Sequence, residues 1–599
     1  MRITLRRLPA GAALGALLLS TLYALPAAAV PAPVVHDGRT QPVFPYGEAV
    51  RETVYVEAPM DSDRDGRRDR VAVAVLRPAQ SEQGMKVATV MKATPYTGKA
   101  PRAATVPDPG VFSEWYDEYF VPRGYAVVEV ELQGTGQSEG CPTTGGPADT
   151  TSVTAAIDWL NGRAPATYAD GRAAVAGWST GDVGMVGLSY DGTLATAAAT
   201  TGVEGLKTIV PEGAISSWYD YARDQGVAYN GNLGTRYPEY QASRVASQSA
   251  TARCGEVLKE LGDAAADDTA DRTAFWDERD YVKDAAGIRS SVLLAQGLAD
   301  TKVRNRHFAA LWQALGEHGV ARKLWLHKGG HEDPLVTGGA AWQETLHRWM
   351  DHWLYRVDNG IMSEPRVSVQ RPDSSWQTSA DWPHPGSRPT HLWFGPASEA
   401  AEGGLLRTPS GSGTQSFTDA PAQNEAVMIS APEAAAPNRL AYLTPPLTKA
   451  THVSGTPTVR VRLSSSTAST PLTALLVDYG PAATPSPAPS PGLSDGTGQV
   501  TAELAPVRKP VTKLPIVSRG ALDVKNRHSL ERPSPLEPGK AHTVSLRLHA
   551  VDHVFPEGHR VGLVIVANDK DYIATDPAAG RLTLGLRASH LVLPTVGGR

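Results

Sequence analysis

The chain has 599 residues, of which 41% are hydrophobic and 20% charged, and its formal net charge is -5. This length predicts more than one domain, each long enough to bury a core. The mild negative charge, with no basic cluster beyond the N-terminus, excludes nucleic acid as an expected partner.

Residues 1–29 are predicted to form a signal peptide and not part of the fold. Three arginines precede an apolar run at 10–25, and the alanines at 27–29 offer a cleavage site. The apolar run is short for a membrane span, and no stop-transfer pattern follows it. We therefore expect a secreted protein with no stable membrane association.

The two cysteines, Cys141 and Cys254, lie in a chain that is expected to reach an oxidising compartment. An even number of cysteines in such a compartment favours a disulfide between them. Two separate free thiols are the alternative that the sequence leaves open.

An acidic loop joins two predicted strands at 53–57 and 70–77. Its D-x-D-x-D-G spacing resembles a calcium loop, but the position of the bidentate glutamate holds Ala72, and several arginines dilute the charge. A polar hairpin is therefore favoured over a calcium site, and no cofactor is expected. The candidate ligands are Asp61, Asp63, Asp65 and Asp69.

Buried apolar strands then alternate with helices, which predicts an α/β fold with a doubly wound, mostly parallel sheet. Residues 216–288 delay the next strand by about seventy residues, which is longer than an ordinary crossover and indicates an inserted helical cap. The α/β-hydrolase domain is predicted at 30–215 and 289–360. Its strands are expected at 87–92, 125–132, 183–188, 206–211, 291–296 and 323–327.

Helical patterns end near Pro365, and residues 361–599 are predicted to form an all-β sandwich domain of the jelly-roll kind. A proline-rich stretch at 481–491 is expected to be a loop within it. The predicted strands are 366–370, 458–463, 472–479, 542–548 and 561–567.

The stretch at 183–193 reads as strand, tight turn and helix, with Ser189 at the apex. A nucleophile elbow needs small residues beside its serine, usually as G-x-S-x-G. Here the second glycine, Gly192, comes one residue later. An ordinary turn with an N-capping serine fits the motif equally well. The chain order of the other candidate residues must therefore distinguish the two interpretations.

Ser189, Asp300 and His331 each follow a predicted strand, in the chain order that an α/β hydrolase requires. His331 would take the serine proton, and Asp300 would fix the imidazole tautomer. His327 lies within its predicted strand, and the two carboxylates after His331 would reverse the expected order. We therefore predict a Ser-His-Asp triad from these three residues.

The oxyanion of the tetrahedral intermediate needs hydrogen-bond donors aimed at it. The backbone N–H of Tyr190 is the first candidate because it follows the serine directly. The second should come from the loop after the strand at 87–92, where Tyr96 lies.

Several segments resemble one known family. Three stretches look like those of the Xaa-Pro dipeptidyl-peptidases, which are serine peptidases of the cocaine-esterase-like α/β-hydrolase group. They are the run G-T-L through V-P-E at 192–212, A-I-S-S-W-Y-D-Y at 214–221 and F-W-D-E-R-D-Y at 275–281. The resemblance covers roughly residue 55 to the C-terminus. It implies a G-x-S-Y-x-G elbow, an oxyanion tyrosine at Tyr96 and a C-terminal jelly-roll domain. Asp191 departs from the apolar residue that relatives often have.

The resemblance implies removal of N-terminal dipeptides whose second residue is proline, from proline-containing peptide substrates. Trp218 and Tyr219 are candidates for an apolar proline pocket, although packing of the cap against the core would explain them equally well. Glu212, Asp220 and Asp277 are candidates for binding the free ammonium group of the substrate.

Two other functions stay open at this point. The same triad would serve an esterase or acylase acting on small acyl esters or amides. A non-catalytic surface- or carbohydrate-binding protein is the third alternative, and the complete set of triad residues argues against it. Metal-dependent hydrolysis has no support in the sequence, which has no H-E-x-x-H motif and no cysteine–histidine cluster. The oligomeric state is not determined by the sequence.

Overall fold

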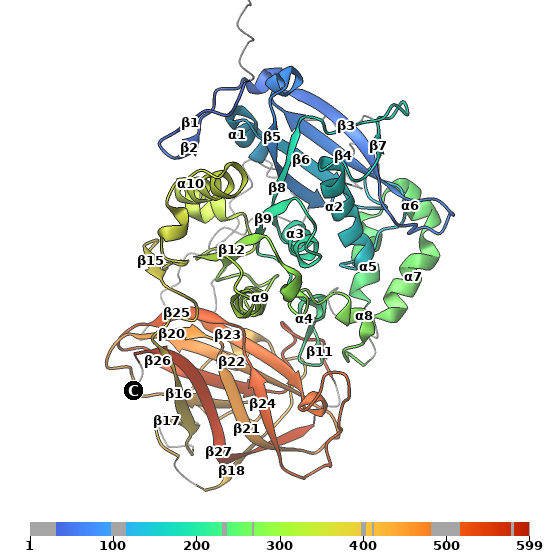
Figure 1. Ribbon diagram of the computed structural model, residues 1–599. Helices are drawn as coiled ribbons and strands as arrows, with labels where there is room; N and C mark the ends of the chain where they lie inside the picture. Colours follow the sequence, from blue (N-terminus) through green and yellow to red (C-terminus); the bar gives the residue numbers. More distant parts are fainter. Residues whose placement is uncertain are drawn as a thin grey trace, which may run out of the picture.

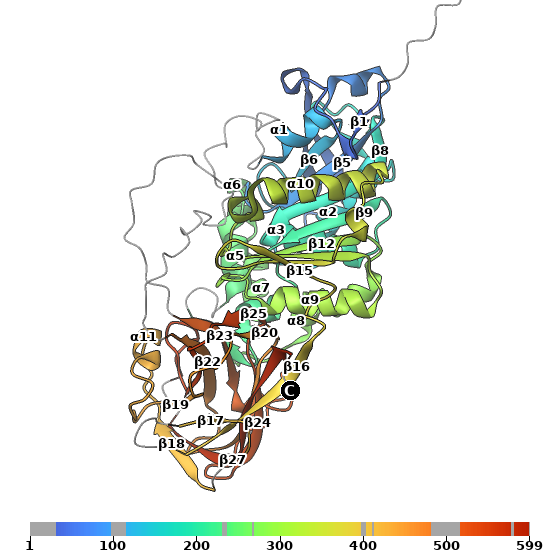
Figure 2. The same ribbon diagram turned by 90° about the vertical axis from the view of Figure 1, so that its left-hand side faces the viewer.

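The computed structural model describes residues 31–97, 115–230, 236–265, 269–396, 403–409, 412–480, 515–576 and 580–597. The predicted signal peptide and the proline-rich stretch at 481–491 lie outside these ranges. An α/β domain carries a mostly helical cap along one side, and a β domain lies at one end of the α/β domain (Figures 1 and 2).

One 11-stranded mixed sheet forms the centre of the α/β domain. Its six central pairings, from β14 to β6, are parallel, and the pairings at both edges are antiparallel. In spatial order the strands are β15 (Trp376–Ser379), β14 (Val367–Gln370), β13 (Arg322–His327), β12 (Ser291–Gly297), β9 (Leu206–Glu212), β8 (Ser179–Leu188), β5 (Val87–Thr94), β6 (Ala126–Glu131), β4 (Arg70–Arg77), β3 (Val50–Glu57) and β7 (Ala166–Thr167).

Helices cover both faces of this sheet, as predicted. Strand β6 shows the reason: Val128 belongs to the core on one face and its neighbour Val127 to the core on the other. Strands buried in this way are mostly apolar because neither face meets water. The first face is covered by α2 (Pro147–Leu160), α3 (Tyr190–Thr200) and α9 (Arg306–Glu317), and the second by α1 (Tyr116–Phe120) and α10 (Pro334–Tyr355).

The inserted segment forms the cap, which contains one short hairpin besides its helices. The hairpin pairs β10 (Arg223–Asp224) with β11 (Val227–Ala228) and reaches the C-terminal domain, where Gln225 Nε2 donates to Ala521 O at 3.0 Å. The helices are α4 (Trp218–Ala222), α5 (Tyr237–Val245), α6 (Gln248–Arg253), α7 (Gly255–Ala264) and α8 (Ala274–Asp277).

The C-terminal domain is built from two antiparallel sheets that share one core. The helix α11 (Glu425–Ile429) packs beside the smaller sheet. The larger sheet contains β16 (Ser387–Phe394), β17 (Leu405–Leu406), β18 (Thr414–Thr418), β20 (Thr451–Gly455), β21 (Thr458–Ser465), β24 (His542–Arg547), β25 (Val551–Phe555) and β27 (Arg581–Val596). The smaller contains β19 (Leu440–Leu443), β22 (Pro471–Tyr479), β23 (Ile516–Asp523) and β26 (Arg560–Val566).

One predicted strand joins the other domain. The segment at 366–370, expected to open the C-terminal domain, forms β14 and pairs in parallel with β13, with Leu324 opposite Val367. The helix α10 makes the crossover between these two strands, so β14 completes a further β-α-β unit. Strand propensity identified the strand but could not say which sheet it joins. In the described part of the chain, no helix has both the length and the hydropathy of a membrane span.

Candidate active site

Ser189 occupies a strained turn between β8 and α3. Its φ of 63° and ψ of -123° lie outside the regions that non-glycine residues favour. A Cβ atom on Gly192 would lie 2.4 Å from the carbonyl oxygen of Gly187, and one on Gly187 would lie 2.6 Å from Cβ of Asp191. The late glycine of the motif is therefore required by close backbone packing inside the elbow.

Asp300 and His331 form a hydrogen-bonded pair at the ends of β12 and β13, with 2.8 Å between Asp300 Oδ2 and His331 Nδ1. The backbone N–H groups of Lys302 and Val303 donate to the other oxygen of Asp300, at 2.8 and 2.9 Å. A carboxylate that accepts from Nδ1 leaves Nε2 of the imidazole free to act as the base.

The 212–213 segment at the end of β9 connects the elbow to this pair. Ser189 N donates to Glu212 O at 2.8 Å. A Cβ on the next residue, Gly213, would lie 3.4 Å from Asp300 Oδ2 and 3.5 Å from His331 Nδ1. The structure therefore brings all three predicted triad residues to one edge of the sheet, around a glycine that leaves them room.

Two of the alternative acids and bases near the triad have other partners. His327 is buried, its Nδ1 lies 2.8 Å from Thr337 Oγ1, and burial lowers its pKa to about 4. Asp333 accepts from Leu335 N at 2.7 Å and caps α10. Burial raises the pKa of Glu332, which follows His331 directly.

Tyr96 and Tyr190, the two predicted oxyanion residues, lie together beside the elbow. Their ring centroids are 6.2 Å apart, and Tyr96 follows β5, the neighbour of β8. Burial and the charge of Asp191 raise the pKa of Tyr96 well above its usual range, so its hydroxyl keeps its proton and can donate. The Tyr190 hydroxyl donates to Asp149 Oδ2 at 2.5 Å, which leaves the backbone N–H of Tyr190 as its candidate oxyanion donor.

The acidic residue that departs from the family pattern is buried in an ion-pair network. Asp191 lies 3.9 Å from Lys92 Nζ, and Lys92 also pairs with Glu129 at 3.0 Å. The added negative charge beside Ser189 is therefore partly balanced by a lysine from β5.

The two predicted pocket aromatics have different surroundings. Trp218 is buried with its ring 4.7 Å from that of Tyr190, and its Nε1 donates to Tyr281 at 3.1 Å. Tyr219 packs inside the cap, where its hydroxyl donates to Ala270 O at 3.0 Å and its ring contacts Trp276. Trp218 therefore lies next to the elbow, whereas the contacts of Tyr219 serve cap packing.

The three predicted ammonium-binding carboxylates also lie in different surroundings. Glu212 is fully buried and lies at the elbow through its backbone. Asp220 lies 3.4 Å from Arg306, and Asp277 lies 2.8 Å from Arg272. Burial raises the pKa of Asp220. Of the three, only Glu212 is placed beside Ser189.

Sequence reasoning missed the residue that completes the surroundings of the predicted acid. Gln296 is buried at the end of β12, and its Nε2 lies 3.2 Å from Asp300 Oδ2 and 3.0 Å from Val303 O. A polar residue near the end of an otherwise apolar strand was the available signal, but it does not indicate which group the side chain meets.

The structure joins Cys141 to Cys254 by a disulfide, with 5.6 Å between their Cα atoms. Cys141 belongs to the loop after β6, and Cys254 lies at the junction of α6 and α7. The bond therefore ties the cap to the sheet.

The acidic loop brings three of its four predicted calcium ligands together. Oxygen atoms of Asp61, Asp63 and Asp65 lie within 4.8 Å of one another. Both carboxylate oxygens of Asp61 accept backbone N–H bonds, and Asp63 pairs with Arg253 at 3.3 Å. Asp69 instead accepts from Ser62. Since the loop is closed by its own hydrogen bonds, calcium binding here stays a prediction with no assigned part in the reaction.

A mostly parallel sheet, a strained serine elbow and an aspartate–histidine pair at strand ends define an α/β hydrolase of the serine type. The comparisons with known proteins then show the family. The chain belongs to the X-Pro dipeptidyl-peptidase family: the family model of the X-Pro dipeptidyl-peptidase (S15 family) matches residues 65–333, and that of the X-Pro dipeptidyl-peptidase C-terminal non-catalytic domain matches residues 359–595. This confirms the resemblance seen in the sequence, and the chain is a hydrolase of this peptidase family.

Individual relatives match this chain over nearly its whole length. A Streptomyces avermitilis protein provisionally named Xaa-Pro dipeptidyl-peptidase is 41% identical, across 100% of this chain and 90% of its own length. The Xaa-Pro dipeptidyl-peptidase of Ligilactobacillus salivarius is 30% identical, across 94% of this chain and 79% of its own. A solved CocE/NonD family hydrolase from Staphylococcus aureus superposes with a TM-score of 0.66 at 15% identity, across 94% and 98% of the two chains, and shows the fold alone.

Proposed function

We propose that the protein is an exported serine peptidase that releases Xaa-Pro dipeptides from the N-termini of peptides through a Ser189–His331–Asp300 triad. The observation that carries this proposal is the meeting of the serine elbow and the aspartate–histidine pair around Gly213. Export is supported by the disulfide between Cys141 and Cys254, because such bonds persist in oxidising compartments.

The reaction follows from the chemistry of these groups. Ser189 Oγ attacks the carbonyl carbon of the proline residue while His331 Nε2 takes the serine proton, and Asp300 stabilises the imidazolium. The Tyr190 N–H and the Tyr96 hydroxyl donate to the oxyanion. The shortened peptide leaves as an amine with the proton from His331. Water, activated by the same histidine, then hydrolyses the dipeptidyl ester on Ser189.

Specificity requires two subsites beyond the triad. Trp218 packs against Tyr190 beside the elbow, and this contact supports its assignment to the pocket for the pyrrolidine ring. We assign the free ammonium group to Glu212 because of its place at the elbow, whereas Asp220 and Asp277 face guanidinium groups.

The test compares three substrates: Gly-Pro-anilide, N-acetylated Gly-Pro-anilide and a simple p-nitrophenyl ester, each with wild type and Ser189→Ala. We expect cleavage of the free-amine substrate alone, and its loss in the variant by a factor on the order of 10⁴ or more. Equal cleavage of the acetylated substrate, or cleavage of the ester alone, would instead establish an esterase or acylase on the same triad.

A further inference from the structure

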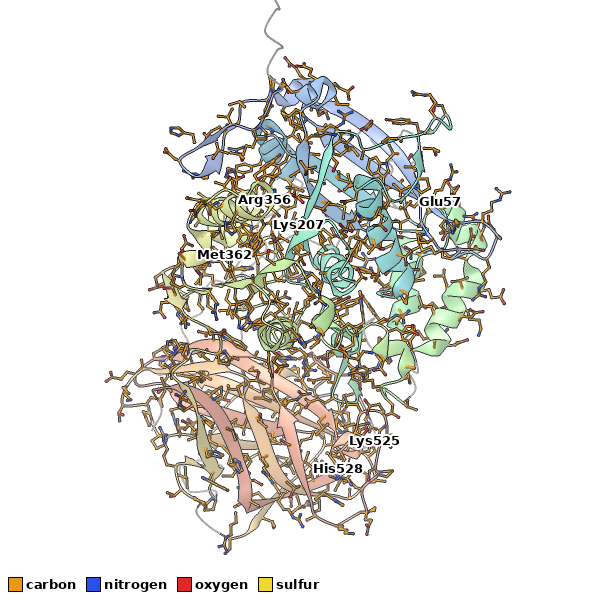
Figure 3. All side chains as sticks on the ribbon, in the orientation of Figure 1. Glu57, Lys207, Arg356, Met362, Lys525 and His528 are labelled. Carbon is orange, nitrogen blue, oxygen red and sulfur yellow. A yellow bond between two sulfur atoms is a disulfide. The ribbon has the colours of Figure 1, made fainter. Side chains whose placement is uncertain are left out.

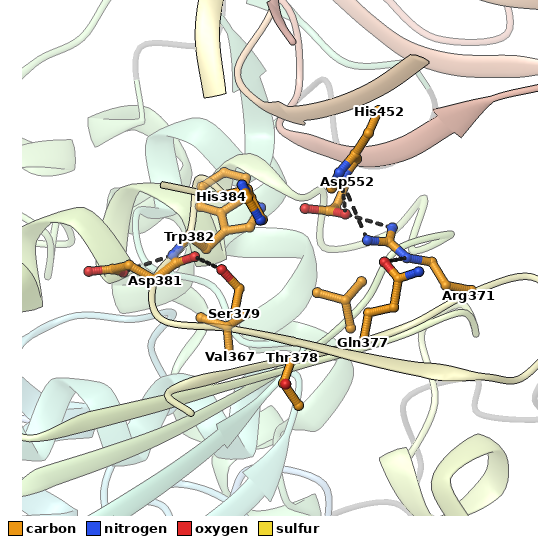
Figure 4. A pocket seen from close by; sticks show the side chains of 11 residues that line it. Val367, Arg371, Gln377, Thr378, Ser379, Asp381, Trp382, His384, His452 and Asp552 are labelled. Atoms are coloured by element: carbon orange, nitrogen blue, oxygen red, sulfur yellow. Dashed lines mark hydrogen bonds and ion pairs between the residues drawn. The ribbon is translucent and has the colours of Figure 1, made fainter. Parts of the chain in front are cut away.

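A cavity of about 90 Å³ lies where the α/β domain meets the C-terminal domain (Figure 4). Its walls come from β14 and β15, from the segment after β15, and from β20 and β25. None of the three triad residues lines it. The polar side chains that matter here are those of Arg371, Asp381, Trp382, His384, His452 and Asp552.

One wall of the cavity is an ion pair that a histidine reinforces. Arg371 Nη1 lies 2.7 Å from Asp552 Oδ1, and His452 Nε2 lies 2.8 Å from the same oxygen. Burial opposes ionisation of Asp552, but the hydrogen bond and charge of His452 and the charge of Arg371 lower its pKa overall. This carboxylate is therefore ionised and already bonded, so the wall does not repel an anion as a free carboxylate would.

The opposite side presents donors. Trp382 is 6% exposed, and its Nε1–H has no hydrogen-bond partner among the described residues. His384 Nδ1 accepts from Gly386 N at 3.0 Å, so the neutral ring carries its proton on Nε2. Figure 4 shows His384 across from Arg371 and Asp552, and its ring centroid is 5.9 Å from that of His452.

The charges around the cavity favour a negative ligand. Asp381, the other lining carboxylate, pairs with Arg322 at 3.4 Å and Arg366 at 3.5 Å. Three guanidinium groups therefore face two carboxylates, which leaves an excess of positive charge around the cavity. A buried donor without an acceptor is costly, and native proteins satisfy it with protein, water or an ion.

We propose that this cavity binds one small oxyanion, a carboxylate or a phosphate-type ion, which accepts hydrogen bonds from Trp382 Nε1 and His384 Nε2. The space suffices, because a single water needs roughly 10–15 Å³ of such a cavity. The ion would bridge the two domains, because β14 and β15 line one side of the cavity and β20 and β25 line the other.

The test is calorimetric titration of the mature, disulfide-bonded protein with inorganic phosphate and, separately, with acetate, at neutral pH. We expect saturable binding of at least one ion. His384→Phe keeps a ring but removes the donor and should weaken binding about tenfold. His528→Phe is the matched control: this exposed histidine of the C-terminal domain lies away from the cavity (Figure 3) and should change nothing.

Binding of phosphate alone identifies a phosphate-type ligand, and binding of acetate alone a carboxylate. Absence of binding by both ions, or unchanged affinity in His384→Phe, would overturn the proposal and leave the cavity to water. If His384→Phe does not fold, wild-type crystals soaked in dilute selenate test instead whether the cavity holds an anion. An anomalous peak between Trp382 and His384 supports the site, and a peak elsewhere or none rejects it.

Discussion

At the scale of single residues, Asp300 is held by more than its histidine. Four donors surround its carboxylate: His331, Gln296 and the backbone N–H groups of Lys302 and Val303. Gln296 Nε2 also donates to Val303 O, so one side chain fixes both the carboxylate and the turn that supports it. We infer that Gln296 positions the aspartate of the proposed triad and does not itself contact the substrate.

Replacing this glutamine should therefore affect turnover more than substrate binding. Gln296→Leu keeps the side-chain volume but removes the donor, and a small displacement of Asp300 is expected to lower kcat by roughly ten- to a hundredfold with KM little changed. Steady-state kinetics with Gly-Pro-anilide measures this. Gln313→Leu, on the exposed side of α9, should behave as wild type. A change confined to KM would contradict the positioning role.

The assignment of Glu212 to the substrate ammonium group gives a second prediction at this scale. Glu212→Gln removes the charge while keeping the shape, so KM for the free-amine substrate should rise about tenfold or more. Asp277→Asn, at the carboxylate paired with Arg272, should leave KM unchanged. A larger effect of the Asp277 change than of the Glu212 change would reverse the assignment.

At the scale of elements, the cap is attached to the loop after β6 by side-chain hydrogen bonds. Tyr281 of the cap donates to Gly145 O at 2.7 Å, and Arg279 Nε donates to Thr144 O at 2.9 Å. The disulfide adds a covalent link between the loop after β6 and the start of α7. The cap is therefore fixed in place next to Ser189.

Removing the covalent link should destabilise the protein. The double change Cys141→Ser and Cys254→Ser opens a loop of 113 residues, and the expected loss in free energy of unfolding is about 2–4 kcal/mol. Urea unfolding followed by tryptophan fluorescence measures the loss. Activity should disappear at lower urea than in wild type because the cap detaches early. Identical unfolding midpoints for the two proteins would show that the noncovalent bonds suffice.

At the scale of the whole molecule, a buried charge network joins the two domains. Asp224, in the cap hairpin, is fully buried and pairs with Arg306 of α9. Its Oδ2 accepts from Ala521 N at 2.8 Å and from the Tyr572 hydroxyl at 2.6 Å, both in the C-terminal domain. Further along the junction, Lys525, labelled in Figure 3, lies 3.5 Å from Thr269 O of the cap.

Cutting this network should be costly because the buried guanidinium of Arg306 would lose the closer of its two carboxylates and keep Asp220. The Ala521 N–H and the Tyr572 hydroxyl would also lose their acceptor. Asp224→Ala is expected to lower stability by about 3–5 kcal/mol. Glu260→Ala removes the half-exposed partner of Arg64 and should cost far less than the Asp224 change, because solvent screens this surface pair. Chemical denaturation of both variants and wild type gives the comparison. Equal losses in the two variants would mean that the junction adds no stability beyond that of a surface ion pair.

The sequence by itself determined the class of fold and the order of the catalytic candidates. Apolar runs alternating with helices indicate a sheet covered on both faces, because only buried strands are apolar throughout. Parallel strands bring their carboxyl ends to one edge, so residues that follow successive strands converge there. That rule selected Ser189, Asp300 and His331 without coordinates, and the family resemblance added Tyr96.

The tertiary structure alone decided which neighbours each side chain meets. Strand propensity predicted the position of β14 along the chain but not the sheet that it joins, since any exposed strand edge offers the same hydrogen bonds. Burial and composition did not separate Glu212 at the elbow from Asp277 beside Arg272, nor show that Tyr219 packs within the cap. Gln296 gains its role only from Asp300, four residues away across a turn. Such contacts depend on how segments distant in the sequence pack together, so no local sequence pattern predicts them.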